Sequence, residues 1–394
     1  MRPADALIPE SATEVANGPP VEYRHCYVHV PFCARRCSYC DFAIAVRKVV
    51  PWREFAHALA AEWKARNMTL TTALDTLYFG GGTPSILGSE GVRHVMDWVR
   101  SVAQLAPNAE VTLEANPEDI TAQSVAAWQQ AGINRLSIGV QSFDDGVLRW
   151  MHRVHNAGAA QRAAQVARDG GISAFSIDLI FALPSSLTRD WNRDLDLALS
   201  LMPDHISLYG LTVEPRTALG KWEARGDVTI APEEQYEEQF LMANEQLTAA
   251  GYEHYEVSNF ARPGKHAVHN SAYWSGSPYL GIGPAAHGYS GDVRRWNAAA
   301  YPRWQASAMA GIDPMSGSET LSAGNRLTER VYLGLRTRDG LLVGASDLPL
   351  VDQWLSAGWL ERVNDAEPRR LRCTPLGWLR LDALASALTA LRSH

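Results

Sequence analysis

The sequence contains no long hydrophobic run and no excess of positive charge. None of its apolar stretches approaches the roughly 20 residues that a membrane-spanning helix requires. The formal net charge is -7 at pH 7, and lysine and arginine form no long block, so the electrostatic footprint of a nucleic-acid-binding protein is missing. We therefore expect a protein without a membrane-spanning helix and without a nucleic-acid partner.

Cysteine is scarce, since the 394 residues include only five. Secreted disulfide scaffolds are small and rich in paired cysteines, so an odd number in a long chain argues against that class. The first segment, residues 1–22, has early acidic residues and no apolar core of the kind that signal peptides carry. We expect this segment to be a disordered leader and the protein to be cytoplasmic.

From Cys26 to about Glu214, apolar runs rich in β-branched residues alternate with amphipathic helical stretches. In the first helical stretch Phe55, Leu59 and Trp63 fall on one face. Strands that are separated by helices pair in parallel, and runs this apolar are covered on both faces, which leaves a doubly wound sheet or a barrel. Six strands are expected, at CYVHVPF, LDTLYFG, EVTLEAN, RLSIGVQ, AFSIDLIFAL and HISLYGLTV.

Polar residues or glycines lie at the end of each expected strand. In a parallel barrel all of these ends open on one face, which is where barrel enzymes build their sites. We therefore expect one functional site at a single mouth. The strand ends are marked, in chain order, by Cys33, GGGTPS at 80–85, Glu114 with Asn116, Gln141, Asp178, and Tyr209 with Thr212.

Three of the cysteines, Cys33, Cys37 and Cys40, follow a C-x3-C-x2-C spacing. A short loop of this kind can wrap three thiolates around one corner of an iron–sulfur cubane, which leaves one iron without a protein ligand. A structural zinc site is the alternative, but it needs a fourth ligand, for which the nearest candidates are His29 and Cys26. The spacing favours the iron–sulfur cluster.

The other strand ends suggest groups that hold a small polar ligand. The bare N–H groups of the GGGTPS segment can bind a carboxylate or an amino acid moiety, although glycines after a strand also simply make turns. Glu114 can hold a ribose hydroxyl or an amine, or be a solvated loop carboxylate. Asp178 lies among apolar residues and must be hydrogen-bonded or paired if it faces inward, and Arg153 is a candidate cation for the same ligand.

After Glu214 the strand and helix alternation stops. Residues 226–315 begin with a polar helical stretch and continue into a segment dense in glycine, aromatic residues and histidine, which we expect to form loop and edge strand over a cavity. Residues 316–394 predict helices around a short hairpin, the outline of a small winged-helix-like domain that serves as scaffold or partner surface. Cys26 and Cys373 are expected to be small buried hydrophobic residues.

As a set, several of these segments identify the chain as similar to radical S-adenosylmethionine (SAM) proteins of the HemW group, relatives of oxygen-independent coproporphyrinogen III dehydrogenase. The resemblance implies an α/β fold: a partial six-stranded β/α barrel over 23–225, followed by a HemN-type C-terminal domain. The segments that carry it are YVHVPFCARRCSYCDF, GGGTPS, EANPE, RLSIGVQSF, IDLIFALP, ISLYGLTVEP and HNSAYW.

The resemblance also implies roles for individual residues. It gives Cys33, Cys37 and Cys40 to a [4Fe-4S] cluster whose open iron is chelated by the amino and carboxylate groups of SAM. The positions that match SAM contacts in the dehydrogenase are Tyr27, Tyr39, Gly81, Gly82, Thr83 and Glu114. The positions that match its second SAM site are Gln141, Arg153, Asp178 and Thr212.

Two further features separate the HemW group from the dehydrogenase. The dehydrogenase pattern continues to a fourth cysteine where this chain has Phe42. The segment HNSAYW fits the H-N-x-x-Y-W pattern that is associated with haem binding in HemW, which makes His269 a candidate axial ligand, with His266 and His287 as alternatives. A histidine among aromatic residues also commonly serves a structural role.

These expectations lead to one preferred function and two alternatives. The preferred hypothesis is a chaperone that binds haem and passes it to acceptor proteins, by resemblance membrane-bound respiratory enzymes, with a SAM-ligated cluster in the barrel. The second is a radical enzyme that decarboxylates coproporphyrinogen III, and the third is a metal-dependent nucleic-acid-binding module, which the acidic charge disfavours. Reductive SAM cleavage and a cluster- or haem-dependent homodimer are left open.

Overall fold

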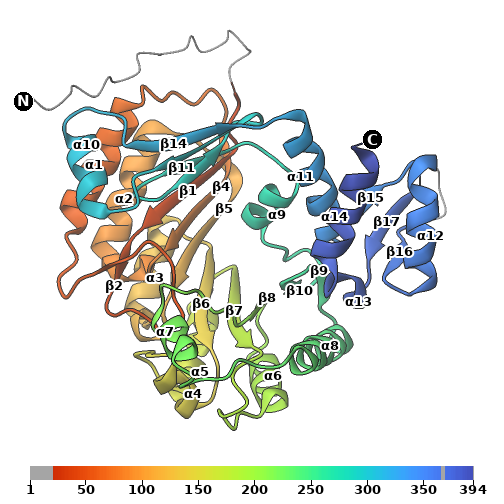
Figure 1. Ribbon diagram of the computed structural model, residues 1–394. Coiled ribbons are helices and arrows are strands. Elements are labelled where there is room, and N and C mark those ends of the chain that lie inside the picture. The colour runs from red at the N-terminus through yellow and green to blue at the C-terminus, as the bar shows by residue number, and fades with distance from the viewer. Residues whose placement is uncertain (1–20, 365–368, 394) are drawn as a thin grey trace, which may run out of the picture.

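Six parallel strands in chain order form the centre of a large sheet (Figure 1). The computed structural model describes residues 21–364 and 369–393, so nearly all of the expected leader lies outside the described residues. The six predicted strands are confirmed, and their order follows the chain without the reversal that a doubly wound sheet requires, so the barrel is the correct choice. They are β1 (His25–Val30), β4 (Leu74–Gly81), β5 (Leu105–Ala115), β6 (Arg135–Gln141), β7 (Ala174–Phe181) and β8 (His205–Gly210).

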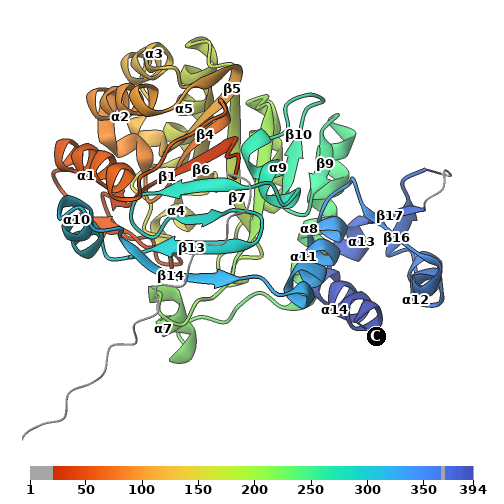
Figure 2. The same ribbon diagram turned by 90° about the horizontal axis from the view of Figure 1, so that it is seen from above.

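Helices between the strands cover the outer face of the sheet (Figure 2). Their apolar residues recur at helical spacing, and on the first helix Phe55 and Leu59 are fully buried. Burying a side chain of this size stabilises the fold by about 1.5–3 kcal/mol. The helices are α1 (Trp52–Ala65), α2 (Gly88–Val102), α3 (Ala122–Ala131), α4 (Asp145–Trp150), α5 (Ala157–Asp169) and α6 (Trp191–Ser200), with α7 (Ala218–Ala224) after β8.

Residues 226–315 mostly extend the sheet at its two edges. On one side β11 (Tyr279–Ile282) pairs in parallel with β1, and β12 (His287–Tyr289), β13 (Val293–Asn297) and β14 (Met315–Thr320) follow it in antiparallel order. On the other side β10 (Asn259–Ala261) pairs with β8, and β9 (Glu253–Glu256) pairs with β10. The helices of this region are α8 (Glu233–Ala249), α9 (Val268–Trp274) and α10 (Tyr301–Met309).

The C-terminal unit consists of helices around a three-stranded sheet, in which Leu341–Leu342 adds a third strand to the hairpin that the sequence predicts. The boundary expected at residue 316 is wrong by several residues, because β14 pairs with β13 in the main sheet and the unit begins only at Ala323. The elements of the C-terminal unit are α11 (Ala323–Arg336), β15 (Leu341–Leu342), α12 (Leu348–Ser356), β16 (Leu360–Arg362), β17 (Arg370–Cys373), α13 (Pro375–Trp378) and α14 (Leu381–Arg392).

No described helix of the protein has both the length and the apolar character needed to cross a bilayer.

The remaining described elements are short. Three are 3-10 turns, of which the first two come shortly after β4 and β5. These elements are β2 (Phe32–Cys33), β3 (Ala45–Val46) and the 3-10 turns at Pro84–Leu87, Pro117–Asp119 and Ala345–Asp347.

A buried carboxylate, Glu62 of α1, ties the first helix to the added strands. Its side chain is fully buried and accepts hydrogen bonds from Asn297 Nδ2 at 2.7 Å, Trp304 Nε1 at 2.8 Å and Gly283 N at 2.9 Å. Arg66 supplies the compensating charge at 3.0 Å. A buried charge is tolerated only when its partners are in place, so this network fixes β11–β13 and α10 against the barrel.

Replacing Glu62 with alanine should destabilise the protein by about 3–5 kcal/mol, because it leaves the buried Arg66 without its partner. Denaturant unfolding measures the change. Glu90→Ala is the matched control, since the Arg53–Glu90 pair is exposed and separated by 3.9 Å, and it should change stability by less than about 1 kcal/mol. Equal losses in the two variants would contradict the structural role of Glu62.

Candidate functional site

The carboxyl ends of the six parallel strands surround one cavity of about 390 Å³, a size typical of small-molecule sites. Every residue that lines it lies between Cys33 and Thr212. The expectation that residues 226–315 cover this cavity is therefore wrong, because that segment adds strands at the sheet edges instead. The convergence of the strand ends on one mouth is as the sequence predicts.

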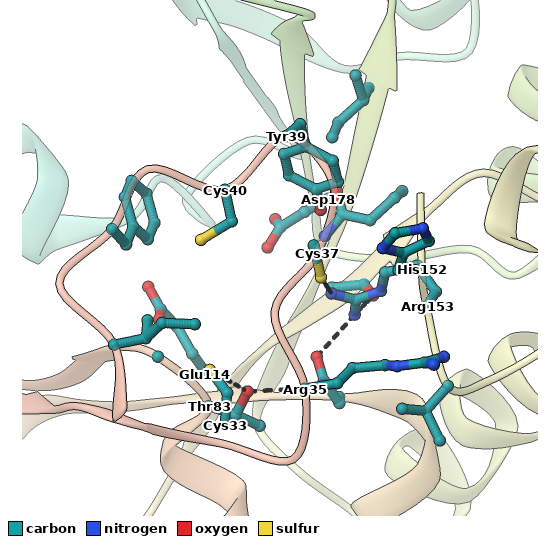
Figure 3. Close-up of a pocket in the computed structure, with 18 of the residues that line it drawn as sticks. Cys33, Arg35, Cys37, Tyr39, Cys40, Thr83, Glu114, His152, Arg153 and Asp178 are labelled. Carbon is teal, nitrogen blue, oxygen red and sulfur yellow. Dashed lines mark hydrogen bonds between the residues drawn. The ribbon is translucent and has the colours of Figure 1, made fainter. Parts of the chain in front are cut away.

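The structure brings almost all of the predicted site residues to this cavity (Figure 3). Only Tyr27 and His269 are absent from its lining. The predicted residues that line it are Cys33, Cys37, Tyr39, Cys40, Gly81, Gly82, Thr83, Glu114, Gln141, Arg153, Asp178 and Thr212.

The loop that carries the three cysteines is fixed by backbone hydrogen bonds on both sides. Its first part pairs as β2 with β3, and Arg47 N donates to Cys33 O at 3.0 Å. At its centre Ser38 N donates to Met151 O at 3.1 Å, and Ser38 O accepts from Leu219 N at 2.8 Å. The loop is thus held between the segment after α4 and the start of α7.

The three thiols have different surroundings. Thr83 Oγ1 donates to Cys33 Sγ at 3.4 Å, and the Arg153 guanidinium donates to Cys37 Sγ at 3.5 Å. Burial raises the pKa of Cys33 to about 11 and also raises the pKa of Cys40. Thiols that are desolvated in this way need a metal or another cation to become thiolates.

The three thiols are suited to an iron–sulfur cluster by their chemistry and by the cavity that they share. Within residues 21–364 and 369–393, no group of three or more histidine, cysteine or acidic side chains is close enough to hold one metal ion. The three cysteines nevertheless line one cavity and surround open space in Figure 3. The donor set is all thiol, as iron–sulfur clusters require, so these residues fit a cubane and give no support to the zinc alternative.

The glycines of GGGTPS let the backbone approach the cysteine loop closely. Gly82 N donates to Val30 O at 2.8 Å, and a Cβ atom at Gly82 would lie 2.7 Å from the Phe32 carbonyl oxygen. At Gly81, φ is +115° and a Cβ atom would lie 2.6 Å from the His29 ring. No larger residue fits either position without moving the chain.

Glu114 lies at the end of β5 and is held by groups from β4. Its carboxylate accepts from Tyr78 OH at 2.8 Å and from Gly81 N at 3.0 Å. Burial raises its pKa to about 7, and the nearby Asp178 carboxylate adds to this shift. A buried carboxylate poised in this way can accept a hydrogen bond from a ribose hydroxyl or an amine.

Asp178 and Arg153 both face the cavity, but each has its own partners. Asp178 accepts from Ser137 Oγ at 2.9 Å and from Ser176 Oγ at 3.2 Å, and burial raises its pKa. Arg153 NH2 donates to Asn116 Oδ1 and to the Gly139 carbonyl, both at 2.7 Å. The Nε atom of Arg153 is buried and has no hydrogen-bond partner among the described residues.

Gln141 reaches the cavity through an irregularity in its strand. The register between β6 and β7 shifts between Gly139 and Gln141, and Gln141 has a φ of 71°. Bulges of this kind re-aim side chains next to functional sites.

Tyr27 and His29 form the layer of the barrel interior beneath the mouth. The Tyr27 hydroxyl is 3.2 Å from His29 Nδ1, and His29 Nε2 is 3.1 Å from the Ala43 carbonyl oxygen. Burial lowers the pKa of His29 to about 4, so the ring is neutral and supports the cysteine loop. Tyr27 stands away from the cavity because it precedes the end of β1 by three residues.

His269 lies toward the opposite end of the barrel, on α9. Its Nδ1 is 2.6 Å from Thr76 Oγ1 near the start of β4, and its Nε2 is 2.8 Å from Tyr273 OH. The side chain is 1% exposed, it stacks on Tyr78, and burial lowers its pKa to about 3. Haem ligation by His269 stays a prediction, and it requires one of these hydrogen bonds to break and α9 to move.

Sequence reasoning missed several residues of the lining. Arg35 and His152 carry the most chemistry, and each has a signal in the sequence: Arg35 lies inside the cysteine spacing, and His152 directly precedes Arg153. The other missed residues include Ile44, Glu118, Ser137, Val154 and Leu211.

The comparisons with known proteins agree with this geometry. Residues 27–198 match the model of the radical SAM superfamily. The haem chaperone HemW of Mycobacterium tuberculosis strain H37Rv is 38% identical over 92% of this chain and 94% of its own length. This chain belongs to the HemW family of radical SAM proteins. HemW of Escherichia coli K12 is 37% identical, over 70% of this chain and 74% of its own.

Among solved structures, coproporphyrinogen III oxidase (HemN) of Escherichia coli has the same fold. It superposes with a TM-score of 0.79 over 95% of this chain and 91% of its own, at 22% identity. This likeness shows that the two chains share one fold, which includes both the barrel and the C-terminal unit. Membership of the radical SAM superfamily implies a [4Fe-4S] cluster and SAM, for which the mouth of the barrel supplies thiols and polar groups.

Replacing Cys37 with serine should abolish the cluster, because two thiolates cannot hold a cubane corner against water and oxygen. Iron and sulfide analysis after anaerobic reconstitution measures the loss. Cys373→Ala is the control, since Cys373 is buried in the C-terminal unit, and it should retain full iron. Near-stoichiometric iron in the Cys37 variant would contradict the assignment of Cys37 as a cluster ligand.

SAM affinity should increase as the pH rises through about 7, the pKa of Glu114, because only the ionised carboxylate accepts hydrogen bonds with both oxygens. Isothermal titration of the cluster-loaded protein across this range gives the profile. Glu114→Gln should bind more weakly and flatten the profile near pH 7. If the slope is unchanged in the glutamine variant, Glu114 is not the titrating group.

Proposed function

We propose that this protein is a haem chaperone, which binds haem and transfers it to acceptor proteins while carrying a SAM-ligated [4Fe-4S] cluster in its barrel. The observation that carries the proposal is the match to proteins named haem chaperone HemW, at 38% identity over 92% of this chain and 94% of theirs. A match of this extent includes the barrel, the added strands and the C-terminal unit.

The arrangement of the cavity supports the cofactor part of the proposal. Cys33, Cys37 and Cys40 would hold the cluster, and Gly82 and Glu114 would hold SAM on the side of β4 and β5. A reduced cluster, when bound, supplies an electron beside SAM. This chain's residues position these groups, because the loop is fixed at both ends and the carboxylate is held by two donors.

A second group of residues offers room for a further ligand. Gln141, Arg153, Asp178 and Thr212 also line the cavity, and the Arg153 guanidinium brings a positive charge that suits an anionic group. A second SAM molecule, or part of the bound haem, would occupy this space.

The acceptor is a protein, by resemblance a membrane-bound respiratory enzyme, and the transfer would take place in the cytoplasm. A nucleic-acid role is disfavoured, because two arginines of the C-terminal hairpin already have internal partners. Arg372 pairs with Glu361 at 2.7 Å, and Arg370 donates to the Gly340 carbonyl at 3.0 Å. A homodimer stays a prediction.

The alternative function is oxidative decarboxylation of coproporphyrinogen III, the activity that the HemN fold neighbour suggests. Phe42 favours the chaperone, because it replaces the fourth cysteine of the dehydrogenase pattern. Its ring is 61% exposed at the mouth of the cavity, where it presents an apolar surface to a porphyrin.

Haem titration of the anaerobically purified protein, followed by a decarboxylation assay with coproporphyrinogen III, separates the two functions. The chaperone should bind haem with a defined Soret band and leave the porphyrinogen side chains intact. Release of carbon dioxide together with a failure to bind haem would replace the chaperone with the dehydrogenase.

A further inference from the structure

One histidine at the mouth of the barrel has a free imidazole ring. His152 is the only histidine among the described residues that line the cavity. Within the described part of the chain its ring has one aromatic neighbour, Trp222, at 5.6 Å between ring centroids, and its ring nitrogens make no hydrogen bond. Figure 3 places it beside Arg153 and Cys37.

Other histidines near the barrel axis are engaged. His29 and His269 each use both ring nitrogens in hydrogen bonds inside the protein. His155 Nε2 is 3.1 Å from the Val140 carbonyl, and its Nδ1 faces Glu118 at 3.3 Å. Neutral imidazole binds iron through a nitrogen lone pair, so a ring without protein partners is the one ready to do so.

The backbone at His152 holds the residue in a fixed position. Its φ is 59°, in the left-handed region that glycine adopts freely and that other residues adopt only at a cost. The conformation is enforced on both sides, since His152 N donates to Arg149 O and Met151 O accepts from Ser38 N. With Arg153 N donating to Leu148 O, His152 is the left-handed residue that closes the C-terminus of α4, so helix capping fixes the place of its ring at the cavity mouth.

The surroundings of His152 match the chemistry of a porphyrin. Phe42, Val154 and Tyr209 line the same cavity and are 61%, 55% and 45% exposed, so they offer apolar surface to the faces of the ring. Arg35 lines the mouth too, and its guanidinium has no partner among the described residues. An unpaired guanidinium suits a propionate carboxylate, which binds arginine in a bidentate manner.

We propose that His152 is the axial ligand that holds the haem cargo at the mouth of the barrel, above the cysteine loop. This inference rests on the proposed haem-binding function and names the residue and the surface that perform it. It places haem at the carboxyl end of the strands, on the same face as the cluster, whereas ligation by His269 would place it toward the other end.

The test replaces His152 with glycine in the full-length, cluster-loaded protein. Glycine removes the imidazole and relieves the left-handed backbone, so the fold should be retained or stabilised. We expect the haem Soret band to shift and haem affinity to fall by at least about tenfold, as is typical when a metal site loses a supporting group. Free imidazole added to the solution should restore the wild-type spectrum, because the vacated space admits it.

Controls separate ligation from general effects. His152→Asn tolerates the same backbone conformation and should behave like the glycine variant. His57→Ala removes an exposed histidine on α1 and should bind haem as the wild type does. His269→Ala should leave the Soret position unchanged, and all four variants should retain wild-type iron in the cluster.

Each of the other possible results overturns either the proposed haem-binding function or the assignment of the ligand to His152. If the wild type itself does not bind haem, the proposed function fails, and this inference with it. If the wild type binds haem and His152→Gly has the same spectrum and affinity, the function stands and His152 is not the ligand. A shift that appears only in His269→Ala would assign ligation to His269. Loss of cluster iron in His152→Gly would assign the ring to the cluster and overturn the proposal.

Discussion

The parallel pairing of consecutive strands is the constraint on which the rest of this molecule depends. Because β1, β4, β5, β6, β7 and β8 follow one another in the sheet and run in the same direction, their carboxyl ends meet at one rim. Residues from Cys33 to Thr212 therefore line a single cavity although they are far apart in the sequence. The helices between the strands bury the outer face, which leaves the rim free to carry polar and sulfur-containing side chains.

Arg153 joins the parts of this rim. One guanidinium bonds to the cysteine loop through Cys37, to the end of β5 through Asn116 and to β6 through Gly139. It also balances the negative charge that thiolates and nearby carboxylates bring into a desolvated space. A cation with five donors in a fixed plane performs both tasks at once, which a lysine could not do.

The two ends of the barrel are built for different purposes. At the mouth, exposed apolar residues remain available to a ligand, as do the His152 ring and the Arg35 guanidinium, which have no hydrogen-bond partner among the described residues. Toward the opposite end, α9 covers the interior with His269 and Tyr273, whose polar atoms bond to each other and to Thr76. The stack from His269 through Tyr78 to Glu114 connects the two ends, so α9 helps to position a carboxylate at the mouth.

The sequence by itself determined the six strands, the cysteine set and most of the residues at the mouth, and its resemblance to a known family implied the barrel, which the strand order then confirmed. Strand period and helical period are local properties, and glycine, cysteine and acidic residues at strand ends are visible without a structure. Only the tertiary structure decided which side chains have partners. Asp178 is held by serines rather than by Arg153, and Tyr27 lies a layer below the rim. Both nitrogens of His269 are hydrogen-bonded, whereas those of His152 have no partner in the part of the chain that the structure describes. These facts depend on depth within the barrel and on contacts between distant segments, which no local pattern records.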